Sequence, residues 1–226
     1  MLNLFRSIIM LALVAAGIQT AAAHPHVWIK AKADLIFDEN NHFTAIRHKW
    51  EFDEGFAAFA TQGLDENGDG KYSREELAEL AKVNVESVAD FEFFTFVQMG
   101  KVDPKYGKPK DYWLEYENGL LTLFYTLPMA EPVKPDPKTG YKDLTIEVFD
   151  ATFFVAVEFE KENAVALFGP NDKATSCTAD LTRPLEIDPI KSQLLSEIGP
   201  DESVPEDLNP EAGELSNTIR VTCPTS

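Results

Sequence analysis

The chain has 226 residues, of which 38 are acidic and 20 are basic, giving a formal net charge of −18. Such a charge argues against nucleic acids and anionic membrane surfaces as partners, because both are negatively charged. A chain of this length can bury a sizeable core within a single domain.

The first 23 residues have the three parts of a secretory signal peptide. Arg6 makes the start positive, Ile8 to Ala16 is an apolar run too short to span a membrane, and Ala21-Ala22-Ala23 is a small-residue cleavage site. An uncleaved anchor is the alternative. We expect residues 1–23 to be removed and residues 24–226 to form one periplasmic domain that does not insert directly into a membrane.

Cleavage after Ala23 would make His24-Pro25-His26 the new amino terminus. The free α-amine and the His24 imidazole could chelate a metal, and His26 could add a third nitrogen, a donor set that suits Ni²⁺, Co²⁺, Cu²⁺ or Zn²⁺. Pro25 has no amide hydrogen to ionise, which blocks the square-planar amino-terminal motif. Asp53 and Glu54 should lie near His26 and could add oxygen ligands. The alternative is that both histidines do nothing at a frayed terminus.

Two segments, 27–37 and 43–53, alternate apolar and polar side chains as half-buried strands do. Residues 38–42 between them form a turn-like cluster, so the two strands should make an antiparallel hairpin. Only one kind of register puts apolar side chains opposite one another. The expected pairs are Lys30 with Glu51, Asp34 with Arg47, Ala31 with Trp50 and Ala33 with His48.

The two remaining histidines have separate predicted environments. His48 falls on the apolar face of its strand and should be a buried, hydrogen-bonded core residue rather than a metal ligand. His42 falls in the turn and should be solvent-exposed.

Residues 65–76 have the sequence of an EF-hand calcium loop, Asp-Glu-Asn-Gly-Asp-Gly-Lys-Tyr-Ser-Arg-Glu-Glu. Calcium takes roughly six to eight oxygen ligands, which such a loop supplies from alternate positions and a final bidentate glutamate. Gly70 occupies the sharp turn of the loop, where a positive φ is needed. The expected ligands are Asp65, Asn67, Asp69, the backbone carbonyl of Lys71, Ser73 and Glu76.

The sequence contains no second loop of this kind, and sensor EF-hands normally occur in pairs. Three charged ligands in an unpaired loop favour weak affinity, roughly 10⁻⁵ to 10⁻³ M, and a structural role. The alternative is a solvated Asp/Asn/Gly turn between two helices. Residues 55–90 should be an inserted helical hairpin that carries the loop.

The rest of the chain predicts short strands separated by turn signals. Asn118-Gly119 between two alternating runs is a tight hairpin signal. The aromatic run Phe91, Phe93, Phe94 and Phe96 is expected to be core, and residues 101–110 and 131–140 are expected to be loops. The predicted strands are 91–99, 112–117, 120–127, 144–149, 153–159, 164–168 and 218–223.

The C-terminal region is acidic and rich in proline, and Asp188-Pro189 is a helix-start signal there. Ile190, Leu194 and Leu195 would pack on one side of this helix. The predicted fold is therefore α+β and mainly β: an antiparallel β-sandwich with an inserted EF-hand helical hairpin and a short helical C-terminal region.

Cys177 and Cys223 are the two cysteines of the chain. In an exported protein an even number of cysteines indicates a disulfide bond. Closing this loop would contribute on the order of 4 kcal/mol to stability in the chain-entropy account. A thiolate metal site is the alternative.

Several short motifs carry a resemblance to a known family. They are His24-Pro-His-Val-Trp, Phe52-Asp-Glu, Gly63-Leu-Asp-Glu-Asn-Gly-Asp-Gly, Ala81-Lys-Val-Asn-Val-Glu-Ser, Phe94-Thr-Phe, Glu147-Val-Phe-Asp and Phe154-Val-Ala. Together they resemble the bacterial domain-of-unknown-function family 1007. The resemblance implies a periplasmic component of an uncharacterised ABC-type transport system, with a nickel/cobalt-type permease as a neighbour, and it implies no catalytic residue.

Three hypotheses follow. The first is a periplasmic metal-binding accessory protein for transport, with structural Ca²⁺ in the loop, a transition metal at His24 and His26, and an inner-membrane metal permease or ABC transporter as partner. The second is a histidine-brace copper mono-oxygenase, which would need a further histidine in space. The third is a purely structural, calcium-stabilised interaction module. No catalytic residues stand out, so we expect a binding protein rather than an enzyme.

Overall fold

The computed structural model of the chain is mainly β, with two sheets and short helices, and so confirms the predicted fold class. It describes residues 25–134, 144–152, 154–173, 175, 177–185, 188–196, 198, 204–205, 207–208 and 216–223. The predicted signal peptide and His24 lie outside the described residues. No helix among the described residues is both long and apolar enough to cross a membrane.

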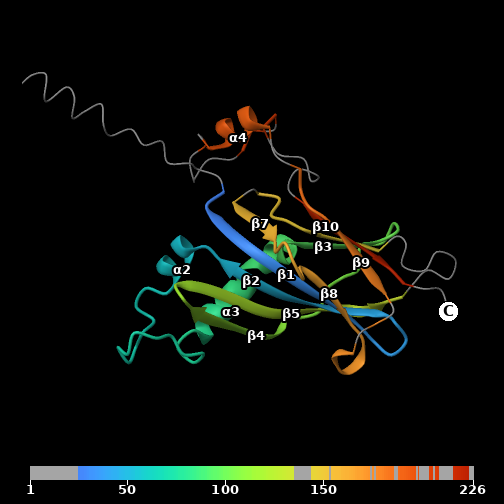
Figure 1. Ribbon diagram of the computed structural model, residues 1–226, viewed down its shortest axis with the longest axis horizontal. Helices are drawn as coiled ribbons and strands as arrows, with labels where there is room; N and C mark the ends of the chain where they lie inside the picture. The colour runs from blue at the N-terminus through green and yellow to red at the C-terminus, as the bar shows by residue number, and fades with distance from the viewer. Residues whose placement is uncertain are drawn as a thin grey trace, which may run out of the picture.

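The elements follow one another along the chain as Figure 1 shows. The strands are β1 Val27–Phe37, β2 Phe43–Phe52, β3 Thr95–Met99, β4 Lys110–Glu117, β5 Leu120–Val133, β6 Leu144–Val148, β7 Val155–Phe159, β8 Val165–Phe168, β9 Thr178–Thr182 and β10 Asn217–Thr222. The helices are α2 Glu54–Ala60, α3 Ala78–Ser87 and α4 Pro189–Ser196, with 3-10 segments η1 Val88–Phe94 and η2 Pro170–Asp172.

The larger sheet has the order β4-β5-β2-β1-β7, with β8 also paired to β1, and the smaller has the order β3-β6-β10-β9. The smaller sheet is antiparallel, but β1 pairs in parallel with both β7 and β8, so the larger sheet is mixed. One hydrophobic core contains buried side chains from both sheets. Helix α3 packs against β4, and α2 lies near β5 (Figure 1).

The register predicted for β1 and β2 is confirmed, because Lys30 lies opposite Glu51 and Asp34 opposite Arg47. The same pairing sets Ala33 against His48, which is buried as expected. Beyond β2, the loop predicted from residue 131 begins later, since β5 continues through Val133 and pairs there with Phe43.

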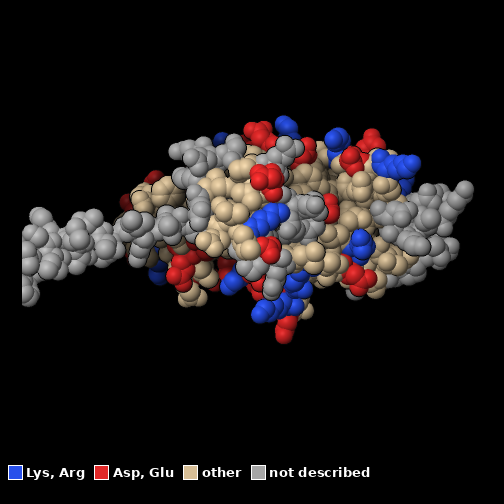
Figure 2. Space-filling view, turned by 90° about the horizontal axis from the view of Figure 1, so that it is seen from above, with Lys and Arg blue, Asp and Glu red and all other residues tan. Residues whose placement is uncertain are grey.

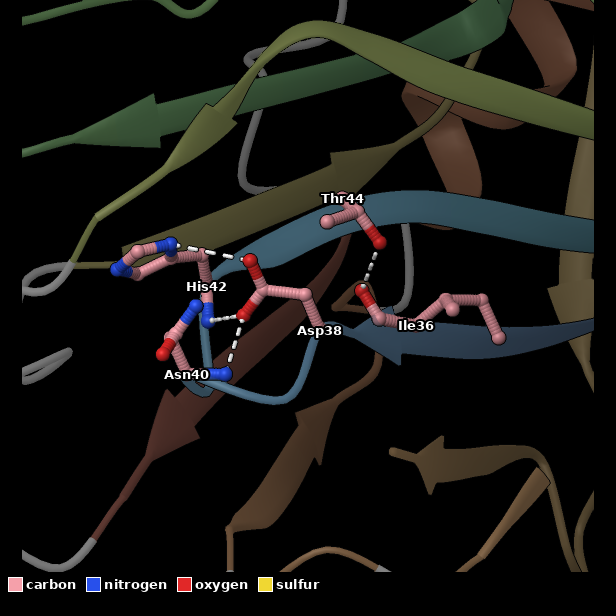
Figure 3. Close-up of polar contacts among 5 residues, drawn as sticks. All are labelled: Ile36, Asp38, Asn40, His42 and Thr44. Carbon is pink, nitrogen blue, oxygen red and sulfur yellow. Dashed lines mark hydrogen bonds and ion pairs between the residues drawn. The ribbon is translucent and has the colours of Figure 1, made fainter. Parts of the chain in front are cut away.

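The β1–β2 turn is organised by Asp38 (Figure 3). Asp38 Oδ1 accepts hydrogen bonds from the backbone N–H groups of Asn40 and His42, and Oδ2 lies 3.1 Å from His42 Nδ1. Partial burial opposes ionisation of Asp38, but these donors outweigh it and lower its pKa. His42 is therefore not the freely exposed residue that the sequence suggested: its side chain is 25% exposed and contacts a carboxylate.

Residues 91–94 do not form the first half of a strand, which corrects the prediction for 91–99. Glu92, Phe93 and Phe94 have φ angles of 51°, 55° and 49°, in the left-handed region, and β3 begins only at Thr95. A strand sends adjacent side chains to opposite faces, whereas this left-handed turn buries both Phe93 and Phe94. Phe91 was expected in the core but is 47% exposed.

The C-terminal region is tied to the smaller sheet by the predicted disulfide, which joins Cys177 to Cys223. The bond closes one end of the β9–β10 pair, and β9 itself was not predicted. Asp188 caps α4 by accepting the N–H groups of Ile190 and Lys191. Only part of the predicted apolar side of α4 is buried, because Leu195 is covered while Ile190 is 70% exposed and Leu194 is also exposed.

Candidate calcium loop and neighbouring sites

The loop between α2 and α3 is folded around the carboxylate of Asp65. Its Oδ1 accepts the N–H groups of Gly68 and Asp69 at 2.8 and 3.1 Å, and its Oδ2 accepts the N–H of Gly70 at 3.0 Å. Gly68 and Gly70 have φ angles of 71° and 77°, a conformation that glycine adopts without steric cost. The sequence therefore encodes this turn locally.

The two ends of the loop meet at Glu76. Its Oε1 accepts the N–H of Glu66 at 3.1 Å, and its Oε2 accepts both the N–H and the hydroxyl of Ser73 at 2.8 Å. The Ser73 backbone and hydroxyl donors lower the pKa of Glu76. Glu76, the last predicted ligand, is thus tied to Glu66, the residue that follows the first predicted ligand.

The middle of the loop continues the same pattern. Asn67 Oδ1 accepts the N–H of Asp69, and Asp69 Oδ1 accepts the N–H of Lys71. Throughout the described ranges, no three His, Cys, Asp or Glu side chains lie close enough together to hold one metal ion. The loop's carboxylates are turned toward its own amides rather than toward a common centre.

The loop is braced against β4 and the core. The Tyr72 ring packs edge-on against Tyr116 of β4, with ring centroids 4.7 Å apart, and Leu77 is fully buried. In the entering helix, Ala57 and Thr61 stand where larger apolar residues are usual in EF-hands. Both are buried, and the Thr61 hydroxyl donates to the Ala57 carbonyl, so the small side chains allow close packing.

Arg74, the tenth residue of the loop, connects it to the outer face of the larger sheet. Its guanidinium forms an ion pair with Glu115 and lies 4.9 Å above the ring of Trp113. Glu115 also accepts the Trp113 Nε1–H at 2.9 Å. Burial opposes ionisation of Glu115, but the Trp113 and Arg74 donors outweigh it and lower its pKa.

His26, the histidine of the predicted amino-terminal metal site that the structure describes, is held by the residue that precedes β7. The His26 N–H donates to the carbonyl of Phe154, and the two rings lie 4.8 Å apart. Asp53 was expected beside His26, but its carboxylate accepts the N–H groups of Trp28 and Phe56 and so caps α2. His26, Asp53 and Glu54 are not gathered into a metal-holding group.

His48 lies in the core between aromatic rings. It stacks on Tyr125 at 4.7 Å, contacts the edge of Trp50, and is 2% exposed. Thr95 Oγ1 donates to the Phe93 carbonyl, so it accepts from His48 Nε2 at 3.3 Å, which assigns the proton to Nε2. Burial lowers the pKa of His48 to about 3 and keeps it neutral.

The sequence pattern did not indicate a row of side chains that crosses the outer face of the larger sheet. The row is formed by directly opposite residues of four strands: Lys32 with Lys49, Lys49 with Phe124, and Phe124 with Trp113. We call these four residues and Arg74 the cation–aromatic row. The predicted β1–β2 register and the Asn118-Gly119 hairpin already imply its first and last pairs, but only the fold brings β2 beside β5.

Comparison with known proteins gives a family but no activity. The profile of a family described as "Protein of unknown function (DUF1007)" matches residues 9–223. An uncharacterized protein of Haemophilus influenzae is 26% identical over 144 residues, which is 63% of this chain and 66% of that protein. An "Uncharacterized 15.5 kDa protein in trpE 3'region" of Spirochaeta aurantia is 28% identical over 103 residues, covering 46% of this chain and 70% of that protein. The chain thus spans just under two thirds of the Haemophilus protein.

Proposed function

Because this chain belongs to the DUF1007 family, whose description names no activity, we propose a function from its own residues. The protein is a calcium-binding accessory protein of an extracytoplasmic compartment, with one Ca²⁺ held by residues 65–76. The observation that supports this most directly is the order of oxygen donors along a loop whose glycines adopt positive φ and whose two ends are joined through Glu76.

The donor set fits a hard cation. The Asp65, Asn67 and Asp69 side chains, the Lys71 carbonyl, Ser73 and Glu76 would supply the oxygens, which is the ligand order of EF-hand loops. The carboxylates now accept loop amides, and a divalent ion would balance their charge and fix the loop. With no second such loop in the sequence, the ion acts as a structural staple rather than as a switch.

The disulfide supports the proposed extracytoplasmic location. A bond between Cys177 and Cys223 persists in oxidising surroundings, such as the periplasm, and is rare in the cytosol. A periplasmic location with millimolar calcium would suit a weak, structural site. The amino-terminal signal peptide remains the sequence-based argument for export.

Transition-metal capture at the amino terminus is the second part of the proposal. His26 is fixed against Phe154 by a backbone hydrogen bond and by ring packing. Cleavage after Ala23 would place the α-amine and imidazole of His24 two residues from this fixed point. An inner-membrane metal permease or ABC transporter is then the proposed partner, a role that rests on the family resemblance alone.

Calcium binding is tested by thermal unfolding with and without Ca²⁺. A ligand at 100 times its Kd stabilises the folded state by about 2.7 kcal/mol, which raises Tm by roughly 5–10 °C in a chain of this size. Glu76→Gln should abolish the rise, whereas Glu75→Gln, the neighbouring non-ligand carboxylate, should keep it. An unchanged Tm for the wild type at millimolar Ca²⁺ would contradict the proposal.

Transition-metal capture is tested by titration calorimetry on protein with the processed amino terminus. Ni²⁺, Co²⁺, Cu²⁺ or Zn²⁺ should bind at one equivalent, and binding should vanish in His24→Ala and weaken in His26→Ala. Protein that begins with an extra Met should behave like His24→Ala, because the chelating amine is displaced. If none of the four ions binds stoichiometrically, this part of the proposal fails while the calcium result stands.

A further inference from the structure

The outer face of the larger sheet holds a positive spot in an acidic protein. On the face shown in Figure 2, acidic and basic side chains are interspersed among other residues. Within the β1–β2 pair, however, Lys32 lies directly opposite Lys49. Like charges opposite one another in a sheet are destabilising. The pairs on either side are complementary, Lys30 with Glu51 and Asp34 with Arg47, so the two lysines break a pattern of matched charge.

The two lysines are not neutralised by a direct ion pair. In the part of the chain that the structure describes, no carboxylate lies within ion-pair distance of Lys32 or Lys49, although Glu115 acts on Lys49 at longer range. The chain has almost twice as many acids as bases, so carboxylates were available to pair with them. Two cations held at this point are consistent with a bound anion.

The lysines line a hollow with an aromatic wall. It has a volume of about 370 Å³, at the lower end of the range for small-molecule sites, and its lining includes Trp113 and Phe124. These two rings are stacked 4.8 Å apart at an interplanar angle of 8°. Arg74 lies over the Trp113 ring, and the Lys49 ammonium lies 5.9 Å from the centre of the Phe124 ring.

The other charged groups of the hollow do not cancel the lysines. Asp34 faces Arg47 at 3.5 Å, so this pair adds little net charge. Asp111 is the remaining carboxylate of the lining, and its single negative charge offsets only one of the two lysine charges. The hollow therefore combines a net positive charge with an apolar wall, whereas the protein as a whole repels anions.

We propose that this hollow binds a small organic anion, a carboxylate attached to a planar ring. The carboxylate lies between the Lys32 and Lys49 ammonium groups, and the ring packs along Phe124 and Trp113. Charge-assisted hydrogen bonds to the lysines select for an anion, and contact with the aromatic wall favours anions that carry an apolar body. This site is separate from the calcium and amino-terminal metal proposals.

The test uses 2-naphthoate as probe, with 2-naphthylmethanol and inorganic phosphate as comparison ligands, in titration calorimetry with the whole mature protein. Naphthoate should bind at one equivalent, and more tightly than either comparison ligand. Lys32→Gln and Lys49→Gln should each weaken it at least about tenfold, the loss expected for one charged hydrogen bond. Lys82→Gln removes the same charge from α3 and should leave the affinity unchanged.

Three results would overturn the proposal. They are the absence of saturable naphthoate binding, equal affinity for the neutral alcohol, and equal affinity in the Lys32→Gln and Lys82→Gln proteins. Circular dichroism of each variant confirms that it is folded, so a lost affinity is assigned to the site. Trp113→Phe keeps a stacked ring and should retain binding, which separates the aromatic wall from any role of the indole N–H.

Discussion

The loop at 65–76 and the turn at 92–94 both place residues at positive φ, but they do so by opposite means. The loop uses Gly68 and Gly70, for which this conformation carries no Cβ penalty. The turn uses Glu92, Phe93 and Phe94, each of which is strained there by roughly 1–2 kcal/mol. The loop is therefore specified by its own sequence, whereas the turn is held by burial of Phe93 and Phe94 in the core.

Removing the packing that holds the turn should have the largest effect. Phe94 is buried and stacks near Trp50, so Phe94→Ala should lower the free energy of unfolding by about 3–5 kcal/mol in urea denaturation. Phe91→Ala changes the exposed ring of the same turn and should cost less than about 1 kcal/mol. Similar losses for the two variants would mean that core packing does not hold the turn.

Acid should lower the stability of the folded protein through His48, which contacts Thr95 directly after the turn. The His48 pKa is about 3 when folded and about 6.5 when unfolded. The unfolded chain therefore binds the extra proton, and stability falls as pH drops from about 6.5 toward 3, at roughly 1.4 kcal/mol per pH unit.

The variant His48→Phe isolates the contribution of His48 to the pH dependence of stability. Between pH 7.5 and pH 5 its free energy of unfolding should fall by about 2 kcal/mol less than that of the wild type. The proposed origin of the pH dependence is wrong if His48→Phe and wild type show parallel pH profiles.

Adding a side chain to a glycine of the loop and removing a side chain from the turn should change stability in opposite directions. Gly70→Ala puts a Cβ at φ 77° and should cost about 1–2 kcal/mol, and it should weaken the calcium-dependent rise in Tm. Glu92→Gly relieves strain at φ 51° and should leave stability unchanged or raise it by up to about 1 kcal/mol. Thermal and urea unfolding measure the stability of both variants. A higher stability of Gly70→Ala than of the wild type would contradict the proposed difference between loop and turn.

The smallest expected effect lies on the outer sheet face. Lys32→Gln removes like-charge repulsion with Lys49 and should raise the free energy of unfolding by about 0.2–1 kcal/mol while it weakens naphthoate binding. Lys30→Gln, two residues away, breaks a complementary pair with Glu51 and should give no gain. A loss of stability in Lys32→Gln would show that the lysine is structural.

Features encoded over short stretches were predictable. The β1–β2 register followed from the apolar faces, the Asn118-Gly119 hairpin from its turn residues, and the helices around residues 65–76 from the loop motif. The α4 cap at Asp188 also followed from a local signal.

Features that depend on distant contacts were not predictable. The parallel pairing of β1 with β7 and β8 joins segments more than a hundred residues apart. Residues 91–94 have strand-like composition, yet the core imposes a left-handed turn on them. Two of the three opposed pairs in the cation–aromatic row were implied by the two hairpins, but the pairing of Lys49 with Phe124 required the β2–β5 contact.

Arg74 is shared by the 65–76 loop and the cation–aromatic row. It is the tenth residue of the 65–76 loop, and its guanidinium rests on Trp113 at one end of the cation–aromatic row. If an ion in the loop and a ligand on the sheet face both shift Arg74, their binding is coupled. The ion then changes the affinity for the ligand by the same factor by which the ligand changes the affinity for the ion, since linkage between two binding sites is reciprocal. The indole of Trp113 would then report, by its fluorescence, on events at either site.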